Sequence, residues 1–364
     1  MVLKTYKYRL YPNKQQEILL QKTFGCCRFV YNQTLYYRKK LYENESKNMN
    51  KFSCNQYVNQ VLKKEFEWLK EVDSLALANA QMNLDKAYKN FFRDKSVGFP
   101  KFKSKKNNNK SYTTNNQNGT IYIENNKIKL PKLKSMIKIK LHRKFTGTIK
   151  SCTISQKPSG KYFISILVDC ENKLLPKNNN KVGIDLGIKE FAITSDGEFF
   201  NNPKWLRKSL KKLNKLQKDL SRKKKGSNNR NKQRIKVAKL YEKITNQRQD
   251  FLHKLSHYII NENQVIVIED LKVSNMLKNH KLAQAISEVS WFEFRRQLEY
   301  KSKWYGRKLI IAPSNYASSQ LCSHCGNKSS QTKDLSCRTY KCPVCGMIMD
   351  RDLNASKNLL KLAM

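Results

Sequence analysis

Three acidic residues stand out by their positions in the sequence. Two of them lie in or at the end of apolar segments, and the third lies near the start of a predicted helix. Asp185 lies in the run GIDLG, within a segment otherwise built of apolar residues, and Glu269 closes the apolar run VIVIE. Asp352 lies in DRDLNAS, near the start of the last predicted helix. Burying a carboxylate is unfavourable unless a cation or hydrogen bonds compensate its charge. These three acids together predict a catalytic site for two Mg²⁺ ions roughly 4 Å apart, although Asp352 alone is also explained as a helix N-cap.

Two CxxC pairs predict a structural zinc site. The four cysteines are Cys322, Cys325, Cys342 and Cys345. Two thiolates on one tight turn face one ion, and a closed shell of four leaves no position for water. Gly326 and Gly346 each follow a pair, where the turn needs either a positive φ or an unobstructed amide near sulfur. Cys337, between the pairs, is interpreted as a bystander; free or disulfide-bonded cysteines are the alternative.

The segments around these residues predict an α/β sheet covered on both faces. KVGIDLGI, QVIVIED and RKLIIAP are predicted strands, and FAITSDGEFF is predicted to be a hairpin turning at Asp196-Gly197. Helices are expected over 204–262, over WFEFRRQLEYKSKWYG and over DLNASKNLLKLA. We therefore expect a nuclease domain at 179–364 with a zinc ribbon inserted at 320–348. Gly183 and Gly187 flank Asp185 and are expected to leave room for a substrate backbone.

The N-terminal half predicts a small β-barrel interrupted by helices. A strand is expected over Lys4–Tyr11, helices over about 13–95, and strands over about 120–170, with hairpins turning at Asn125-Asn126 and near Ser159-Gly160. The barrel then comprises 1–12 and 106–178, and 13–105 is the helical insert. Between them, KKNNNKSYTTNNQNG is predicted to be a polar loop, and ENKLLPKNNN a linker.

The charge of the chain favours a nucleic acid as its partner. Lysine and arginine number 73 against 28 acidic residues, a formal net charge of +45. Neutralising phosphates releases counterions and adds affinity that does not depend on sequence. A membrane surface is the alternative, but no apolar run approaches the roughly 18 residues of a membrane span. MVLKTYKYRL lacks an apolar signal core, so we expect a cytoplasmic protein.

Two helical segments are candidate nucleic-acid contacts. Between Lys204 and Arg248 the sequence has 18 basic residues against two acidic ones, whereas a solvated helix pair would normally mix both signs. The candidate contacts there are Lys211, Lys215, Arg222, Arg230, Arg234 and Arg248. On the second segment, SLALANAQMNLDKAYKNFF, the polar stripe contains Asn79, Asn83 and Lys86. Asparagine reads adenine edges and lysine contacts phosphate or guanine, although an ordinary polar face explains this stripe equally well.

Taken in order, these motifs resemble the TnpB family, transposon-encoded relatives of the type V CRISPR effectors. The matching stretches are KYRLYPN, FGCCRFVYN, GFPKFKSK, GIDLGIKEFAITSDG, RQDFLHKLS, VIVIEDLKV, SSQLCSHCG, YKCPVCG and DRDLNASKNLL. The resemblance implies an N-terminal barrel (WED domain) with a helical recognition insert, followed by an RNase H-like RuvC domain containing the zinc-binding segment. It covers nearly the whole chain.

The resemblance also implies an activity. Asp185, Glu269 and Asp352 match the family's three catalytic acids, and the family's acid is the second in DRDLNAS, which favours Asp352 over Asp350. The family binds a guide RNA derived from the transposon end and cuts double-stranded DNA beside a short target-adjacent motif. A bacterial or archaeal cytoplasm, close to the nucleoid, is the implied location, and a homodimer is left open. Ser356 stands where many relatives have alanine, with no expected consequence.

Three alternatives remain beside the guided nuclease. An RNase H-like transposase acting directly on element ends uses a similar acid triad, but the zinc ribbon and the motif order argue against it. An RNA-guided DNA-binding repressor would show a replaced acid, and all three acids are present. A zinc-finger transcription factor explains the cysteines and the charge but not Asp185 and Glu269.

Overall fold

The computed structural model describes residues 1–106, 110–334 and 336–363. The chain divides into two compact units, Met1–Glu171 and Asn172–Met364, each with its own sheet and core. The division falls a few residues before the predicted domain boundary at residue 179. Within the described part of the chain, no helix is both long and apolar enough to cross a membrane.

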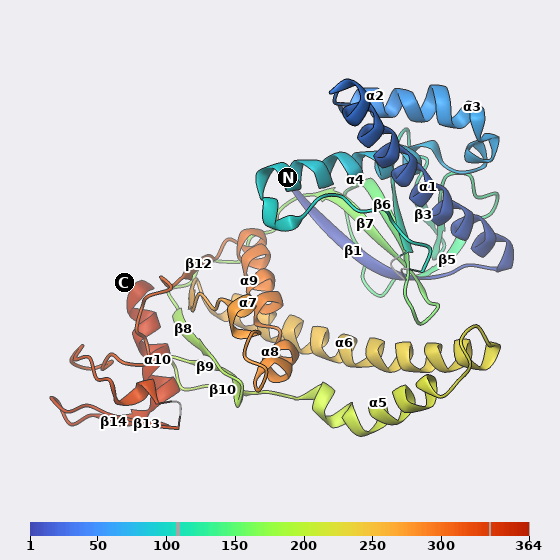
Figure 1. Ribbon diagram of the computed structural model, residues 1–364. Helices are drawn as coiled ribbons and strands as arrows, with labels where there is room; N and C mark the ends of the chain where they lie inside the picture. Colours follow the sequence, from blue (N-terminus) through green and yellow to red (C-terminus); the bar gives the residue numbers. More distant parts are fainter. Residues whose placement is uncertain (107–109, 335, 364) are drawn as a thin grey trace. The chain divides into compact units, whose positions relative to one another are not determined.

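Unit 1 is built on a seven-stranded antiparallel sheet (Figure 1). Its strands, in spatial order, are β2 (Lys110–Asn115), β6 (Thr148–Gln156), β7 (Tyr162–Cys170), β1 (Val2–Tyr11), β5 (Ile137–Lys140), β4 (Lys127–Lys129) and β3 (Tyr122–Glu124). Asn125 and Asn126 both have positive φ, 45° and 56°, which confirms the predicted two-residue hairpin. The described ladders run from β2 to β3, and the predicted barrel closure stays a prediction.

The predicted polar loop at 105–119 is wrong over part of its length. Lys110–Asn115 form strand β2, which pairs with β6 along its whole length. Thr113 and Thr153 hydrogen-bond across this pair at 2.8 Å. Threonine and tyrosine favour strands despite their polarity, so polarity alone misled the prediction. Residues 107–109 of the same loop lie outside the described residues.

Helices cover unit 1 as its sequence predicts for 13–95. They are α1 (Lys14–Glu45), α2 (Lys51–Gln56), the π-helix η1 (Tyr57–Leu62), α3 (Lys63–Glu65), η2 (Glu67–Glu71), α4 (Ser74–Arg93) and η3 (Lys95–Val97). Helix α1 begins with a capping box, in which the Asn13 side chain accepts from the Gln16 amide and the Gln16 side chain accepts from the Asn13 amide. Leu77 and Leu84 of α4 are fully buried and anchor this helix in the unit.

Unit 2 contains a mixed five-stranded sheet in the order β10-β9-β8-β11-β12 (Figure 1). Its strands are β8 (Lys181–Leu186), β9 (Glu190–Thr194), β10 (Phe199–Asn201), β11 (Val265–Ile268) and β12 (Lys308–Ile311). The first three form an antiparallel meander, whose β9–β10 turn contains Gly197 at φ 87° as predicted. Strands β11 and β12 run parallel to β8.

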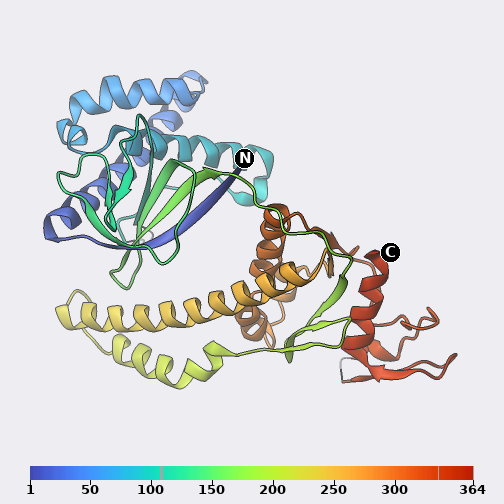
Figure 2. The same ribbon diagram turned by 180° about the vertical axis from the view of Figure 1, so that it is seen from behind.

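Helices cover both faces of this sheet, as predicted. The helices are α5 (Trp205–Ser221), α6 (Asn228–Glu262), α7 (Val273–Met276), α8 (Ala283–Val289), α9 (Trp291–Tyr305) and α10 (Arg351–Leu360), with 3-10 turns η4 (Gln331–Lys333) and η5 (Lys361–Ala363). Ile184 of β8 shares a core with Leu252 of α6 and Phe294 of α9. On the opposite face, Val267 of β11 packs against Leu359 of α10. Figure 2 shows α5 and α6 running side by side as a long hairpin.

Candidate active site

The parallel pairing of β8 and β11 brings Asp185 and Glu269 together. Ile184 and Ile268 are partners in the ladder, so the next residue of each strand lies at the same place along the sheet. Both residues are half-buried, and their carboxyl groups lie close enough for each to shift the pKa of the other. This is where open α/β sheets gather functional groups, at the carboxyl ends of their strands.

Burial and neighbouring charges shift the pKa values of both Asp185 and Glu269. Burial raises the pKa of Asp185 well above its ordinary value, and the nearby charges of Glu269 and Asp352 raise it further. Burial also raises the pKa of Glu269, against the lowering effect of a hydrogen bond from Ser318. The charge of Asp352 raises the pKa of both Asp185 and Glu269, so the three predicted acids lie near enough to act on one another electrostatically.

Asp352 and Asp350 have different roles in α10. The carboxylate of Asp350 accepts from the backbone amides of Asp352 and Leu353 at 2.9 and 3.0 Å, so Asp350 is the N-cap. The N-cap explanation of Asp352 is therefore wrong. Its carboxylate instead faces Arg351 Nε at 3.4 Å and Arg338 Nη1 at 3.7 Å.

The expected space for a substrate beside Gly183 is filled by the protein itself. A Cβ atom on Gly183 would meet the backbone oxygen of Ser356 at 2.1 Å and the backbone nitrogen of Leu360 at 2.5 Å. A Cβ atom on Gly187 would lie 2.8 Å from the backbone oxygen of Glu190, within its own turn. Both glycines therefore permit close packing of backbone, and Gly183 lets α10 lie directly on β8.

Ser318 is a site residue that the sequence analysis missed. Its hydroxyl donates to Glu269 Oε1 at 2.7 Å, and the residue is buried. Its only sequence signal was its place in SSQLC, immediately before the first CxxC pair. A buried hydroxyl that binds one carboxylate oxygen fixes the direction of the other oxygen.

The acid cluster fits divalent cations. Two of its carboxyl groups are half-buried and have raised pKa values, and a bound cation would offset the repulsion between their negative charges. Oxygen ligands of this kind are the ones that Mg²⁺ and Mn²⁺ prefer. Asp185, Glu269 and Asp352 are the residues that would hold such ions.

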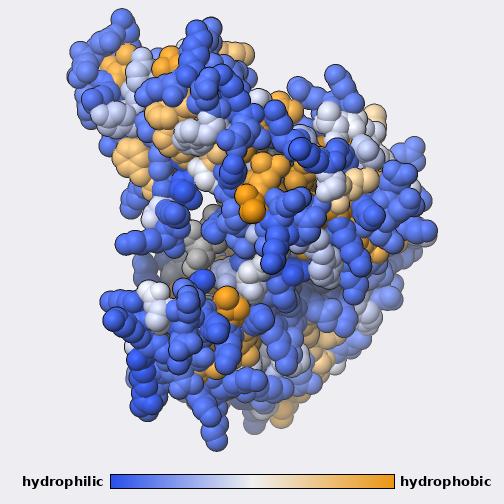
Figure 3. Space-filling model, turned by 90° about the vertical axis from the view of Figure 1, so that its right-hand side faces the viewer, coloured by the Kyte–Doolittle hydropathy of each residue, from blue (hydrophilic) through white to orange (hydrophobic). Residues whose placement is uncertain are grey.

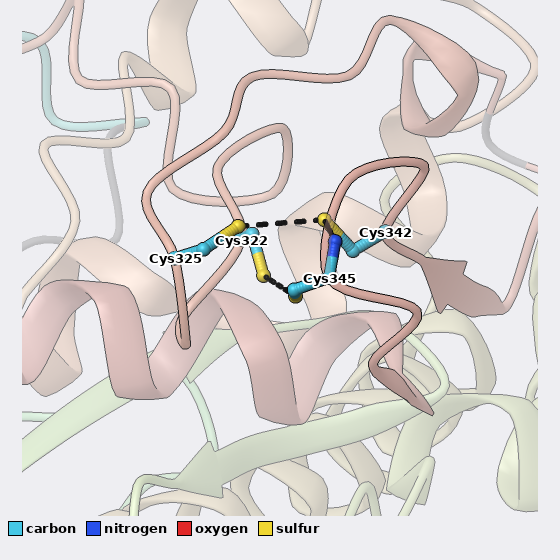
Figure 4. Close-up of side chains that lie close together, drawn as sticks. All are labelled: Cys322, Cys325, Cys342 and Cys345. Carbon is cyan, nitrogen blue, oxygen red and sulfur yellow. Dashed lines mark hydrogen bonds between the residues drawn. The ribbon is translucent and has the colours of Figure 1, made fainter.

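The four cysteines of the two CxxC pairs form one cluster (Figure 4). All four sulfur atoms lie within 4.8 Å of one another. The sulfurs of Cys322 and Cys345 are 3.6 Å apart, and those of Cys325 and Cys342 are 3.5 Å apart. Tetrahedral zinc with Zn–S bonds of about 2.3 Å separates its sulfurs by about 3.8 Å, whereas a disulfide bond is about 2 Å long. The cluster therefore fits a zinc ion.

Two equivalent turns hold these cysteines. In the first, the amide of Gly326 donates to the oxygen of Cys322 at 2.9 Å; in the second, Gly346 donates to Cys342 at 3.1 Å. Both glycines have positive φ, 78° and 71°, as predicted. The short strands β13 (Thr339–Lys341) and β14 (Ile348–Asp350) lie before and after the second turn and pair with each other.

Within this cluster, the Cys345 amide lies 3.5 Å from Cys342 Sγ, and this hydrogen bond lowers the pKa of Cys342 to about 6. Burial and the neighbouring thiols raise the pKa of Cys345 instead, so of these two thiols only Cys342 is shifted toward the deprotonated form that metal binding requires. Cys337 lies outside the cluster, and its thiol donates to the oxygen of Thr339.

The predicted nucleic-acid contacts differ in their freedom to reach a partner. Lys211, Lys215 and Arg222 are exposed on the α5–α6 hairpin. Arg230, Arg234 and Arg248 are half-buried, and Arg248 Nη1 donates to the oxygen of Ser287 at 3.2 Å. Arg248 is thus engaged in holding its own unit together. On the face drawn in Figure 3, hydrophilic residues dominate and apolar residues form smaller separate patches.

The polar stripe of α4 also contains both exposed residues and a residue that is engaged in contacts within the protein. Asn83 and Lys86 are exposed. The amide nitrogen of Asn79 donates to the Leu75 oxygen at 2.8 Å and lies 3.5 Å from the side-chain oxygen of Asn115 in β2. Asn79 therefore joins α4 to the sheet, and the structure gives it a packing role that the sequence did not indicate.

Three family profiles match parts of the chain. Residues 165–280 match a family described as "Probable transposase" (OrfB_IS605), and residues 291–359 match "Cas12f1-like, TNB domain". Residues 1–47 match a family described as "Helix-turn-helix domain". In the structure, those residues hold strand β1 followed by the single helix α1.

Curated relatives align over almost the whole chain. A protein of Streptomyces pristinaespiralis named "Putative RNA-guided DNA endonuclease" is 39% identical over 99% of this chain and 89% of its own length. The Escherichia coli K12 protein "Putative RNA-guided DNA endonuclease InsQ" is 36% identical over 98% of this chain and 92% of its own length. "TnpB-like protein L79" of Acanthamoeba polyphaga mimivirus is 25% identical over 98% of this chain and 73% of its own length.

Among solved structures, a complex of Cas12f1 with sgRNA and target DNA aligns at 15% identity with a TM-score of 0.39, covering 100% of both chains. A CRISPR-Cas12f ternary complex aligns at 16% identity with the same TM-score, covering 95% of this chain and 82% of the other.

Proposed function

The chain belongs to the TnpB family, and from this premise we propose that it is an RNA-guided DNA endonuclease. A guide RNA from the end of its transposable element would pair with one strand of double-stranded DNA beside a short target-adjacent motif. The RuvC-like site of unit 2 would then hydrolyse the DNA. The single observation that carries the proposal is the convergence of Asp185, Glu269 and Asp352 at the carboxyl ends of β8 and β11.

The residues of the site have distinct tasks in this reaction. Asp185 and Glu269, both half-buried, would provide carboxylates that hold two divalent cations, and Asp352 of α10 would complete the set of ligands. Bound magnesium would supply a Lewis acid that activates water and stabilises the leaving oxygen. Ser318, which donates its hydroxyl to Glu269, keeps that carboxylate in one orientation.

The charge of the chain supports a polyanionic partner. A net charge of +45 suits a protein that holds a guide RNA and a DNA duplex through their backbones while base pairing reads the sequence. The exposed lysines and arginine of the α5–α6 hairpin are the contacts that we propose on this side. The four-cysteine cluster would hold a structural zinc ion. A homodimer and a nucleoid location stay predictions.

A transposase acting directly on element ends is the second candidate, favoured by the description "Probable transposase" of the family matched at 165–280. The two functions differ in how the target is chosen. We would incubate the protein with Mg²⁺, a reprogrammed guide RNA and a plasmid library with randomised flanks, and sequence the cut ends.

If the guide chooses the target, the cut site follows each rewritten guide segment, and RNase treatment of the protein abolishes cutting. Strand joining at fixed terminal DNA without RNA would instead establish the transposase. Guided binding without any cutting, by protein with all three acids intact, would establish the RNA-guided repressor.

A further inference from the structure

We propose that the zinc ribbon positions the catalytic acids through a chain of buried hydrogen bonds, in which Ser318, Asn354 and Asn358 are positioning residues. This inference rests on the proposed function, because it concerns the same acid cluster. The two sites differ in their chemistry, since one is built of cysteine thiols and the other of carboxylates. Helix α10 nevertheless contacts the segments that carry both.

The first link joins α10 to the first CxxC turn. Asn354 is fully buried, and its side-chain oxygen accepts from the amide of Ser323 at 2.8 Å. Its side-chain nitrogen donates to the oxygen of Leu321 at 2.7 Å. These two backbone groups flank the ligand Cys322, so a single side chain holds the turn on both sides. Asn354 lies on the same turn of α10 as Asp352.

The second link joins α10 to the segment that leads into this turn. The side-chain nitrogen of Asn358, also buried, donates to the oxygens of Leu321 and Ser318 at 2.6 and 2.8 Å. The hydroxyl of Tyr316 donates to the backbone oxygen of Asn358 at 2.8 Å. Residues 316–321 are therefore fixed on α10 from both of their ends.

The third link reaches the acids. Ser318, whose backbone is held by Asn358, donates its hydroxyl to Glu269 at 2.7 Å. The path from the ribbon thus leads to Glu269 through Ser318 and to Asp352 through α10 itself. Helix α10 also lies on β8 beside Asp185, through the close contact of Ser356 with Gly183.

A fourth contact ties the central loop of the ribbon to the same helix. Arg351 Nη1 donates to the oxygen of Cys337 at 3.3 Å, while its Nε lies 3.4 Å from an Asp352 carboxylate oxygen. The backbone amide of Arg351 also donates to the oxygen of Arg338 at 2.8 Å. The loop between the two CxxC pairs therefore touches the residue next to the third acid.

A zinc ion would fix this arrangement because it holds the two turns against each other. Without it, nothing would join the two CxxC turns at their sulfur atoms, and the turn that binds Asn354 and Asn358 would lose its shape. Outer hydrogen bonds to metal-binding side chains typically change metal affinity about ten- to hundredfold when removed. The positioning residues should therefore act on divalent-cation binding at the acids.

The test uses the full chain with its guide RNA and Mn²⁺ as the probe. Variants Ser318→Ala and Asn354→Ala are compared with Ser319→Ala, a neighbour whose hydroxyl has no hydrogen bond among the residues described. Zinc content is measured by metal analysis, and Mn²⁺ affinity by electron paramagnetic resonance, with a Glu269→Ala sample subtracted for ions bound to RNA. The Mg²⁺ concentration for half-maximal cleavage is measured in parallel.

We expect Ser318→Ala and Asn354→Ala to retain about one zinc per chain while Mn²⁺ affinity falls about tenfold or more, and Ser319→Ala to match the unaltered protein. Cys345→Ser, which removes one zinc ligand, should show the same fall. Ser318→Ala removes only one hydroxyl, so we expect it to fold. If the other variants fail to fold, the Mn²⁺ affinity of Ser318→Ala alone tests the inference.

Unchanged Mn²⁺ affinity in Ser318→Ala would overturn the inference, as would normal affinity in a folded, zinc-free Cys345→Ser protein. Failure of the proposed function has a different signature. In that case the unaltered protein would bind Mn²⁺ at the acids, with the expected losses in the variants, but would not cut DNA at guide-matched sites.

Discussion

The backbone amide of Asp352 donates to the carboxylate of Asp350 at 2.9 Å, so two acids only two positions apart do different work. Asp350 stabilises the first turn of α10 by accepting from its free amides. The carboxylate of Asp352 does not cap the helix, and its charge raises the pKa of both Asp185 and Glu269.

This relationship predicts opposite results for the two acids. Asp352→Asn should abolish guided cleavage, because it removes the charge that divalent cations bind. Asp350→Asn should cut normally, since asparagine caps helices as well as aspartate, and Asp350→Ala should lose about 1 kcal/mol of unfolding free energy. Plasmid cleavage and thermal unfolding measure both effects; cleavage that survives in Asp352→Asn but not in Asp350→Asn would reverse the assignment.

The two strand acids should be indispensable to cleavage. Asp185→Ala and Glu269→Ala are expected to lower the cleavage rate on the order of a thousandfold or more, because neither carboxylate has a substitute in the cluster. Binding of guide RNA and target DNA, measured by gel shift, should stay close to that of the unaltered protein. Appreciable cleavage by either variant would show that the reaction takes place elsewhere.

The raised pKa values of Asp185 and Glu269 predict how stability depends on pH when Mg²⁺ is absent. A carboxyl whose pKa is higher in the folded than in the unfolded state stabilises the fold below its unfolded value, about 4, and this stabilisation is lost as pH rises through the folded value. Asp185→Asn removes one of these groups and the like-charge repulsion with it.

In Mg²⁺-free buffer, Asp185→Asn should therefore be more stable than the unaltered protein near neutral pH, by on the order of 1 kcal/mol, and the difference should shrink toward pH 4. Saturating Mg²⁺ should stabilise the unaltered protein and reverse the order. Chemical denaturation at several pH values measures this; a difference that does not vary with pH would contradict the cause assigned to it.

The contact of Gly183 with Ser356 predicts a strong effect of one methyl group. Gly183→Ala would place Cβ 2.1 Å from the Ser356 oxygen, and α10 would have to move off β8. We expect a loss of about 3 kcal/mol of unfolding free energy, together with loss of cleavage. Gly25→Ala is the matched control, because its Cβ meets nothing within 4 Å and helix α1 favours alanine over glycine by about 0.5–1 kcal/mol.

The cysteine cluster predicts one zinc per chain. Cys342→Ser should lose the ion and destabilise unit 2, because the thiolate lost is a ligand in a closed tetrahedral shell. Cys337→Ser, outside the cluster, should retain the ion and the stability. Metal analysis and thermal unfolding provide the measurements, and a zinc ion retained after replacement of all four ligand cysteines would dismiss the site.

The sequence alone determined those features that depend on neighbours along the chain. The hairpin turn at Asn125-Asn126 and the positive φ of Gly326 follow from local steric preferences, and both occur as predicted. The grouping of the four cysteines could also be predicted from the local sequence, because each CxxC pair places two sulfurs on one turn. The apolar runs around Asp185 and Glu269 marked two strands whose acids lie at their ends.

Tertiary structure decided what those local features contact. Strand β2 forms because β6 offers its edge, which the polar composition of Lys110–Asn115 concealed. The Gly183 site receives α10 rather than a substrate, and Ser318 finds Glu269 49 positions away in the sequence. Such contacts depend on how strands and helices pack together. Spacing along the chain records which face a side chain occupies, but not which element arrives opposite that face.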